Sequence, residues 1–179
     1  MASTEQDIAV AQRAVAHDLQ IAETAVKVRA VPVAVPGITV FSAVIDPKTG
    51  RRATRTGIVQ GGAIYQGTDA MARVARAWGY GGKRTVPAAT VARVFGALHN
   101  PNAESSAFVD EDTIETYKKV SGPRRAATLA MPAETTADGL PAVVYCLTSS
   151  AREIPFSVVT AIIKPDFQVE LRAQPVVED

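Results

Sequence analysis

Residue types that carry out catalysis or bind metals are few in this chain, and they are far apart. There are two histidines, His17 and His99, and one cysteine, Cys146. Neither histidine has a second histidine four residues away or a nearby cysteine pair, which zinc sites need. Cys146 lies within an apolar run, where burial raises the pKa of a thiol and shields its sulfur. We therefore predict no catalytic residue, no metal site and no cofactor.

A glycine-rich and basic segment at 79–85 is the strongest candidate for binding a small anion. It ends in Gly-Lys-Arg-Thr, which resembles a phosphate-binding loop only if the arginine is ignored, and the first glycine of that motif is missing. The pattern predicts a loop between two helices. The alternative is an anion-binding site in which Lys83 and Arg84, beside a helix N-terminus, and His99 hold a phosphate or a carboxylate.

Two further groups of residues are candidates for an interface. Arg51, Arg52 and Arg55 form, with Lys48, a basic patch on a predicted hairpin, which is either a solvated face or a contact with an acidic partner protein or a nucleic acid. Trp78 and Tyr80 flank a glycine at the end of a predicted helix, and aromatic residues are frequent anchors in interfaces. For Trp78, the simpler interpretation is a place in the core.

The N-terminal part predicts one long helix. Ser3 and Gln6 form a capping box, in which each side chain satisfies a backbone N–H of the other. Apolar residues then recur at three-, four- and seven-residue steps as far as Val26, which predicts a helix over about residues 4–27 of an N-terminal region 1–30. The sequence leaves open whether this helix packs on its own sheet or on another chain.

A hairpin region is predicted over 38–65. Two prolines exclude a helix from the connector 31–37. Strands are expected at 38–45 and 51–59, because β-branched residues surround an Asp-Pro-Lys-Thr-Gly turn. A third short strand with a bulge at a glycine pair is expected within 57–67.

The sequence from residue 68 onward predicts short helices followed by strands. A helical segment covers 68–122, in which Thr68 caps a helix that ends at Gly79, and Pro87 opens another. A β-meander covers 126–173. Its strands are expected at 126–131, 142–149, 155–163 and 167–173, with a loop at 132–141. Helices and strands are segregated along the chain, which favours a single α+β domain with an antiparallel sheet over 1–179.

Composition narrows the class of protein. The 179 residues fit one domain, and a hydrophobic fraction of 47% is ordinary for a globular chain. A formal net charge of +1 argues against a dedicated nucleic-acid-binding protein. A single cysteine, a polar N-terminus and no long apolar run indicate a cytoplasmic protein without a membrane span.

The sequence favours a non-catalytic protein-interaction or assembly subunit, which binds a protein partner or forms a homo-oligomer. This expectation combines the missing catalytic motifs with a balanced charge and a generous apolar content. The alternative is a small-molecule-binding domain or an enzyme, whose pocket would lie between the sheet and the helices.

Overall fold

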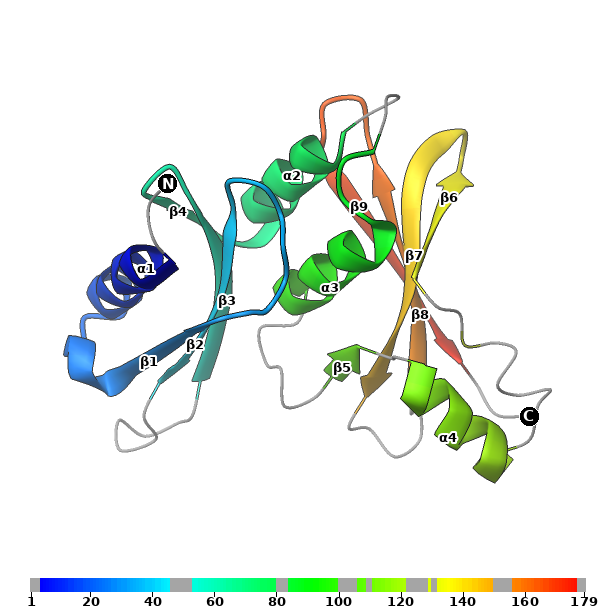
Figure 1. Cartoon of the computed structure of the whole chain (residues 1–179), viewed down its shortest axis with the longest axis horizontal. Coiled ribbons are helices and arrows are strands. Elements are labelled where there is room, and N and C mark those ends of the chain that lie inside the picture. Colours follow the sequence, from blue (N-terminus) through cyan, green and yellow to red (C-terminus); the bar gives the residue numbers. More distant parts are fainter. Residues whose placement is uncertain are drawn as a thin grey trace.

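The computed structural model describes residues 4–45, 53–79, 84–99, 106–108, 111–121, 129, 132–149 and 156–176. These residues form two antiparallel sheets and the helices α1 (Thr4–Asp18), α2 (Gly67–Trp78), α3 (Ala88–His99) and α4 (Glu111–Ser121) (Figure 1). The chain therefore has the predicted α+β class, with an N-terminal helix, a hairpin and a C-terminal meander.

The first sheet is a four-stranded meander in the order β1-β2-β3-β4. Its strands are β1 (Val26–Ala30), β2 (Thr39–Ile45), β3 (Ala53–Gln60) and β4 (Ala63–Tyr65). The predicted strands at 38–45 and 51–59 correspond to β2 and β3. Gly61 and Gly62 both have positive φ, 59° and 78°, which suits the two-residue turn that joins β3 to β4. The glycine pair thus forms a hairpin turn, and not the bulge expected from the sequence.

The second sheet has five strands, namely β5 (Ser106–Phe108), β6 (Ala133–Ala137), β7 (Leu140–Ser149), β8 (Phe156–Ile163) and β9 (Val169–Val176). Strands β7, β8 and β9 follow one another as in the predicted meander, and β5 and β6 pair with the same edge of β7. Of the predicted strand 126–131, only Leu129 lies within the described residues.

The prediction of a loop at 132–141 was wrong, because this segment forms β6 and the start of β7. Asp138 and Gly139 have φ values of 54° and 74° and make a two-residue turn between these strands. An Asp-Gly pair is a strong hairpin signal. The hairpin was missed because β6 has a polar sequence. Four of its five residues are exposed, so the strand shows no hydrophobic alternation.

The predicted helix over 4–27 was too long. Helix α1 ends at Asp18, and Gln20 takes a positive φ of 54° as the chain turns back. A short 3₁₀ helix, η1 (Glu23–Ala25), then leads into β1. Val26 continued the helical pattern in the sequence, but it serves as the first buried residue of a strand.

Helix α2 begins at a different residue from the predicted one. Gln66, and not Thr68, occupies the N-cap position, and it makes no side-chain capping bond. The predicted end at Gly79 is correct. This residue has a φ of 99°, which favours glycine, and its N–H donates to the Ala75 carbonyl.

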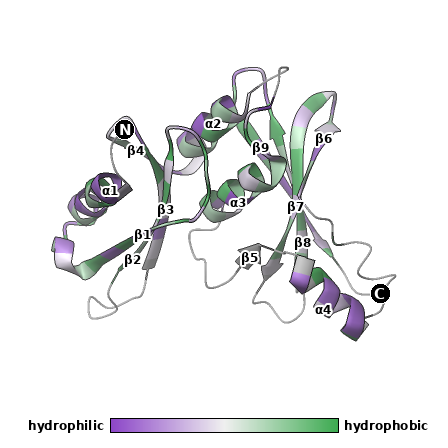
Figure 2. Ribbon diagram, in the orientation of Figure 1, coloured by the Kyte–Doolittle hydropathy of each residue, from purple (hydrophilic) through white to green (hydrophobic). Residues whose placement is uncertain are grey.

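Helices α2 and α3 lie between the two sheets (Figure 1). They contribute about half of a central hydrophobic cluster that also includes Val40 and Ile58 of the first sheet and Val143 and Tyr145 of the second. Hydrophobic residues follow the central strands of both sheets (Figure 2). The central cluster therefore joins the two sheets into one packed body.

Each sheet also has a helix on its outer face. Ala11 and Val15 of α1 pack with Phe41 and Val59 on the far side of the first sheet. On the second sheet, α4 supplies Ile114 and Tyr117, and the Tyr117 ring meets Phe156 edge-on at 4.7 Å between centroids. Among the described residues the layers thus run helix, sheet, helix pair, sheet, helix.

The buried face of α4 is shorter than the sequence pattern implied. Val120 continues the spacing of Ile114 and Tyr117, yet 81% of its surface is exposed, whereas 8% of Ile114 is exposed. The buried face of α4 is therefore confined to the half of the helix nearest its start.

We predict that Gly57→Ala destabilises the protein, whereas Gly96→Ala does not. A Cβ at Gly57 would lie 2.7 Å from the Tyr65 carbonyl oxygen and 2.8 Å from the Phe41 ring, so backbone must move. We expect a loss of about 1–3 kcal/mol in the free energy of unfolding. At Gly96 the nearest atom is the flexible end of Leu147, at 3.3 Å, and alanine favours the helix. Urea denaturation measures both variants, and equal stabilities would contradict the prediction.

Candidate functional site

Arg84 is held by three contacts, which we call the Arg84 cluster. Its guanidinium lies over the indole of Trp78, 4.0 Å from the ring centroid, and donates to the Gly79 carbonyl. Its Nε and Nη2 lie 3.0 Å and 2.9 Å from Oε1 of Glu134 on β6. The side chain is 19% exposed, so it lies at the border of the core. Its contacts link the end of α2 to the second sheet.

Two of the candidate anion-binding residues, Arg84 and His99, lie at opposite ends of α3. Arg84 precedes this twelve-residue helix, which is about 17 Å long, and His99 is its last residue. The charge of Arg84 already has Glu134 as its partner. Lys83 lies outside the described residues.

Burial changes the pKa of His99. Desolvation lowers this pKa below its usual value of 6.5, although the residue lies at the surface. A lowered pKa leaves the imidazole mainly neutral at pH 7. His99 then contributes little positive charge toward holding an anion or toward the dipole of α3.

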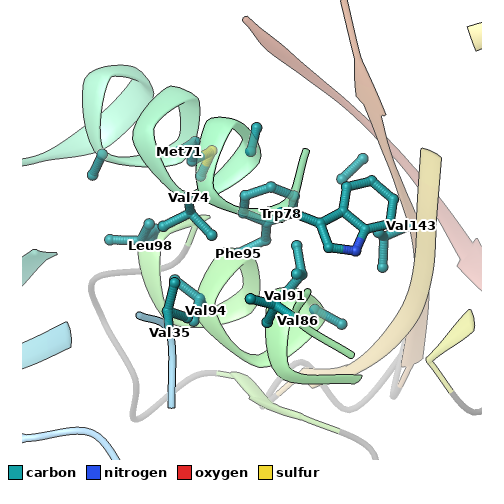
Figure 3. Close-up of a cluster of buried hydrophobic side chains, with 14 of the residues drawn as sticks. Val35, Met71, Val74, Trp78, Val86, Val91, Val94, Phe95, Leu98 and Val143 are labelled. Carbon is teal, nitrogen blue, oxygen red and sulfur yellow. The ribbon is translucent and has the colours of Figure 1, made fainter. Parts of the chain in front are cut away.

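The candidate interface residues fall into three environments. Trp78 is 1% exposed and belongs to the central cluster, where its indole lies beside Val143 of β7 (Figure 3). Arg55 is exposed on β3. Arg51, Arg52 and Tyr80 lie outside the described residues, so the predicted basic patch is described at Arg55 alone.

An open strand edge is a feature that the sequence analysis missed. Strand β1 pairs with β2 on one side only, within the part of the chain that the structure describes. The Val31 N–H donates to the Val40 carbonyl at 2.8 Å, and these residues extend the β1–β2 register. Hydrogen-bonded pairs alternate along an antiparallel ladder. The N–H and C=O groups of Val26, Val28 and Ala30 therefore point away from β2.

The first of these residues is already satisfied from within the chain. The Val26 N–H donates to the Glu23 carbonyl, and its own carbonyl accepts a 3.0 Å bond from Nε2 of Gln12 on α1. Nε2 of Gln12 also donates to the Glu23 carbonyl at 2.9 Å. Gln12 thus closes one end of the edge, and the open groups are the four of Val28 and Ala30.

Two cations stand beside this open edge. Lys27 and Arg29 are exposed, and neither has an ion-pair partner among the described residues. They alternate with Val28, so both project from the face of the sheet opposite α1. A hollow of about 280 Å³ lies there, lined by Lys27, Val28, Arg29 and Val44.

Strand β9, at the edge of the second sheet, is protected differently. The bond from the Lys164 N–H to the Gln168 carbonyl sets the ladder so that Pro175, which has no N–H, faces outward. Arg172 pairs with Glu170 and with Asp138, and Lys164 also pairs with Glu170. The hydrogen bonds from Arg172 and Lys164 lower the pKa of Glu170, so this edge carries fixed charges.

No helix among the described residues is long and apolar enough to span a membrane. Within the same residues, no cluster of three or more histidine, cysteine, aspartate or glutamate side chains is arranged to hold a metal ion. The chain matches no protein-family model, no curated protein sequence and no solved structure.

We predict that the Arg84 cluster contributes to stability mainly through Trp78 and the Gly79 carbonyl. Arg84→Ala removes the cation over the indole and a hydrogen bond, and should lower the free energy of unfolding by about 1–3 kcal/mol. Glu134→Gln should cost less than about 1 kcal/mol, because the ion pair is partly exposed to solvent. Urea unfolding followed by the fluorescence of Trp78, the single tryptophan, measures both. Equal losses would show that the ion pair dominates.

We also predict that His99 makes the protein less stable in weak acid. Its folded pKa lies below the unfolded value of 6.5, so the unfolded state takes up a proton first as the pH falls. Stability should be complete above pH 6.5 and should decline as the pH falls through the folded pKa. His99→Gln should flatten this part of the stability profile, measured by urea unfolding between pH 7.5 and about 5. An unchanged slope in the variant would refute this assignment.

Proposed function

We propose that this protein is a non-catalytic interaction subunit that binds a partner protein through the open edge of β1. The supporting observation is the set of four backbone groups of Val28 and Ala30 that have no hydrogen-bond partner among the described residues, next to the exposed Lys27 and Arg29. An open strand edge is a template for another extended chain. Main-chain hydrogen bonds supply affinity there, and side chains on alternate positions supply specificity.

Three polar side chains near the core, those of Arg84, Asp7 and Arg73, have partners within the chain instead. Arg84 is held by Glu134 and the Gly79 carbonyl, and Asp7 of α1 accepts a 2.5 Å bond from the Thr39 hydroxyl. Arg73 lies over the Tyr65 ring and donates to Gln60. Against this background, the unpaired groups of the β1 edge are available to a partner. The cytoplasmic location expected from the sequence belongs to the same proposal.

The alternative function is the binding of a small molecule. The space expected for its pocket, between a sheet and the helices, holds the side chains of the central cluster, such as Trp78 and Phe95 (Figure 3). A hollow of about 420 Å³ lies elsewhere, beside the connector that follows β1, and Val31, Pro32 and Val40 are among its lining residues. Its volume is within the range of ligand pockets. A metabolite that raises the melting temperature would favour this alternative.

Affinity capture with paired baits tests the proposed function. Ala30→Pro removes one outward N–H from the β1 edge and leaves the bonds to β2 in place. Thr136→Pro makes the same change at an outward position of β6, an exposed strand that pairs with β7. We expect partners captured by the wild-type protein and by Thr136→Pro to be lost with Ala30→Pro. Mass spectrometry quantifies them, and identical sets from all three baits would refute the role of this edge.

A further inference from the structure

The β1 edge has room for a short strand. Gln12 closes it at Val26, and the connector beyond Ala30 leaves the ladder toward Val35, which bridges to Ile38. Between these limits, Val28 and Ala30 present two donors and two acceptors that face outward. A segment of three to five extended residues matches this length, at about 3.3 Å per residue.

The two faces of the edge demand different side chains. Lys27 and Arg29 lie on one face, and alternate residues of a strand are about 6.7 Å apart. Val28 lies on the other face, where it packs against the cluster formed by α1, Val26 and Phe41. A strand added to this edge places its own alternate residues opposite Lys27 and Arg29, and the residue between them opposite Val28.

We propose that the β1 edge binds an extended segment of a partner protein with the pattern acidic–aliphatic–acidic. The two acidic side chains lie opposite Lys27 and Arg29 over the hollow beside Val44. The aliphatic side chain extends the apolar row that begins with Val28. This inference rests on the proposed function, since it names the partner chemistry for the same edge.

The charges argue against a second copy of β1 as the occupant. Pairing two β1 edges in an antiparallel manner brings Lys27 and Arg29 of each copy onto the same face as those of the other. Like charges opposite each other destabilise a strand pair. A partner with carboxylates at these positions replaces this repulsion with attraction.

The experiment measures the binding of a fluorescent heptapeptide, Thr-Glu-Val-Glu-Val-Glu-Thr, to the full chain by fluorescence anisotropy. We expect saturable binding that weakens as the salt concentration rises, because exposed charge pairs are screened. A peptide of the same composition without the alternation should bind at least about tenfold more weakly, since it cannot place valine and glutamate on opposite faces. The lysine analogue should not bind. Equal binding of all three peptides would overturn the proposal.

Two variants assign the binding to the edge. Lys27→Glu with Arg29→Glu should weaken binding at least about tenfold, because two attractive pairs become repulsive. The matched control, Lys118→Glu with Lys119→Glu, makes the same change of net charge on the exposed side of α4 and should change affinity less than about twofold. Ala30→Pro should also weaken binding, while Thr136→Pro should not. Circular dichroism verifies that each variant is folded. If Ala30→Pro does not fold, the two double variants at exposed charged residues still test the proposal.

Other occupants give distinct results. A single-stranded oligonucleotide that binds in place of the peptide, and is lost in the Lys27→Glu, Arg29→Glu variant, would replace the proposal with nucleic-acid binding. A dimer in light scattering that Ala30→Pro dissociates would show that a second copy occupies the edge. If the peptide fails while the edge-dependent capture of partners succeeds, the pattern is wrong and the proposed function stands. If both fail, the edge has neither role.

Discussion

The packing of helices α2 and α3 between the two sheets is the interaction on which the rest of the structure depends. Both inner sheet faces bury their side chains against this helix pair, so neither sheet has a complete core without it. Trp78 is the largest of the fully buried side chains, and full burial of a large apolar side chain contributes about 1.5–3 kcal/mol. Arg84 covers its indole and links the end of α2 to β6. Arg84 thus adds a polar link to the hydrophobic packing that joins the helix pair to the second sheet.

This arrangement also explains where the molecule is open. The central cluster fills the middle of the space between the sheets and the helices α2 and α3, and the outer faces carry α1 and α4. Two strand edges, at β9 and at β1, differ in how they are protected. Strand β9 has an outward proline and a network of ion pairs, whereas β1 is closed by Gln12 only at its first residue. The unequal protection makes the β1 edge the candidate site.

Much of the fold could be predicted, because local patterns carry it. The β2–β3 hairpin, the end of α2 at Gly79 and the buried face of α3 each depend on residues close together in the sequence. The errors occur where local patterns conflict with packing. Val26 fits a helix by spacing, but pairing with Ile45 makes it a strand residue. Strand β6 is exposed and shows no alternation, so its pairing with β7 leaves no hydrophobic signal.

The candidate site was hidden for a related reason. Lys27 was expected at the end of a helix and Arg29 just beyond it, and the openness of a strand edge is a property of the sheet and not of its residues. By itself, the sequence determined the class of fold, most of the elements and the scarcity of catalytic residue types, since these depend on composition and short-range spacing. The tertiary structure alone decided that β1 pairs with β2 and that β6 pairs with β7. It therefore decided which backbone groups remain unpaired and which charges stand beside them.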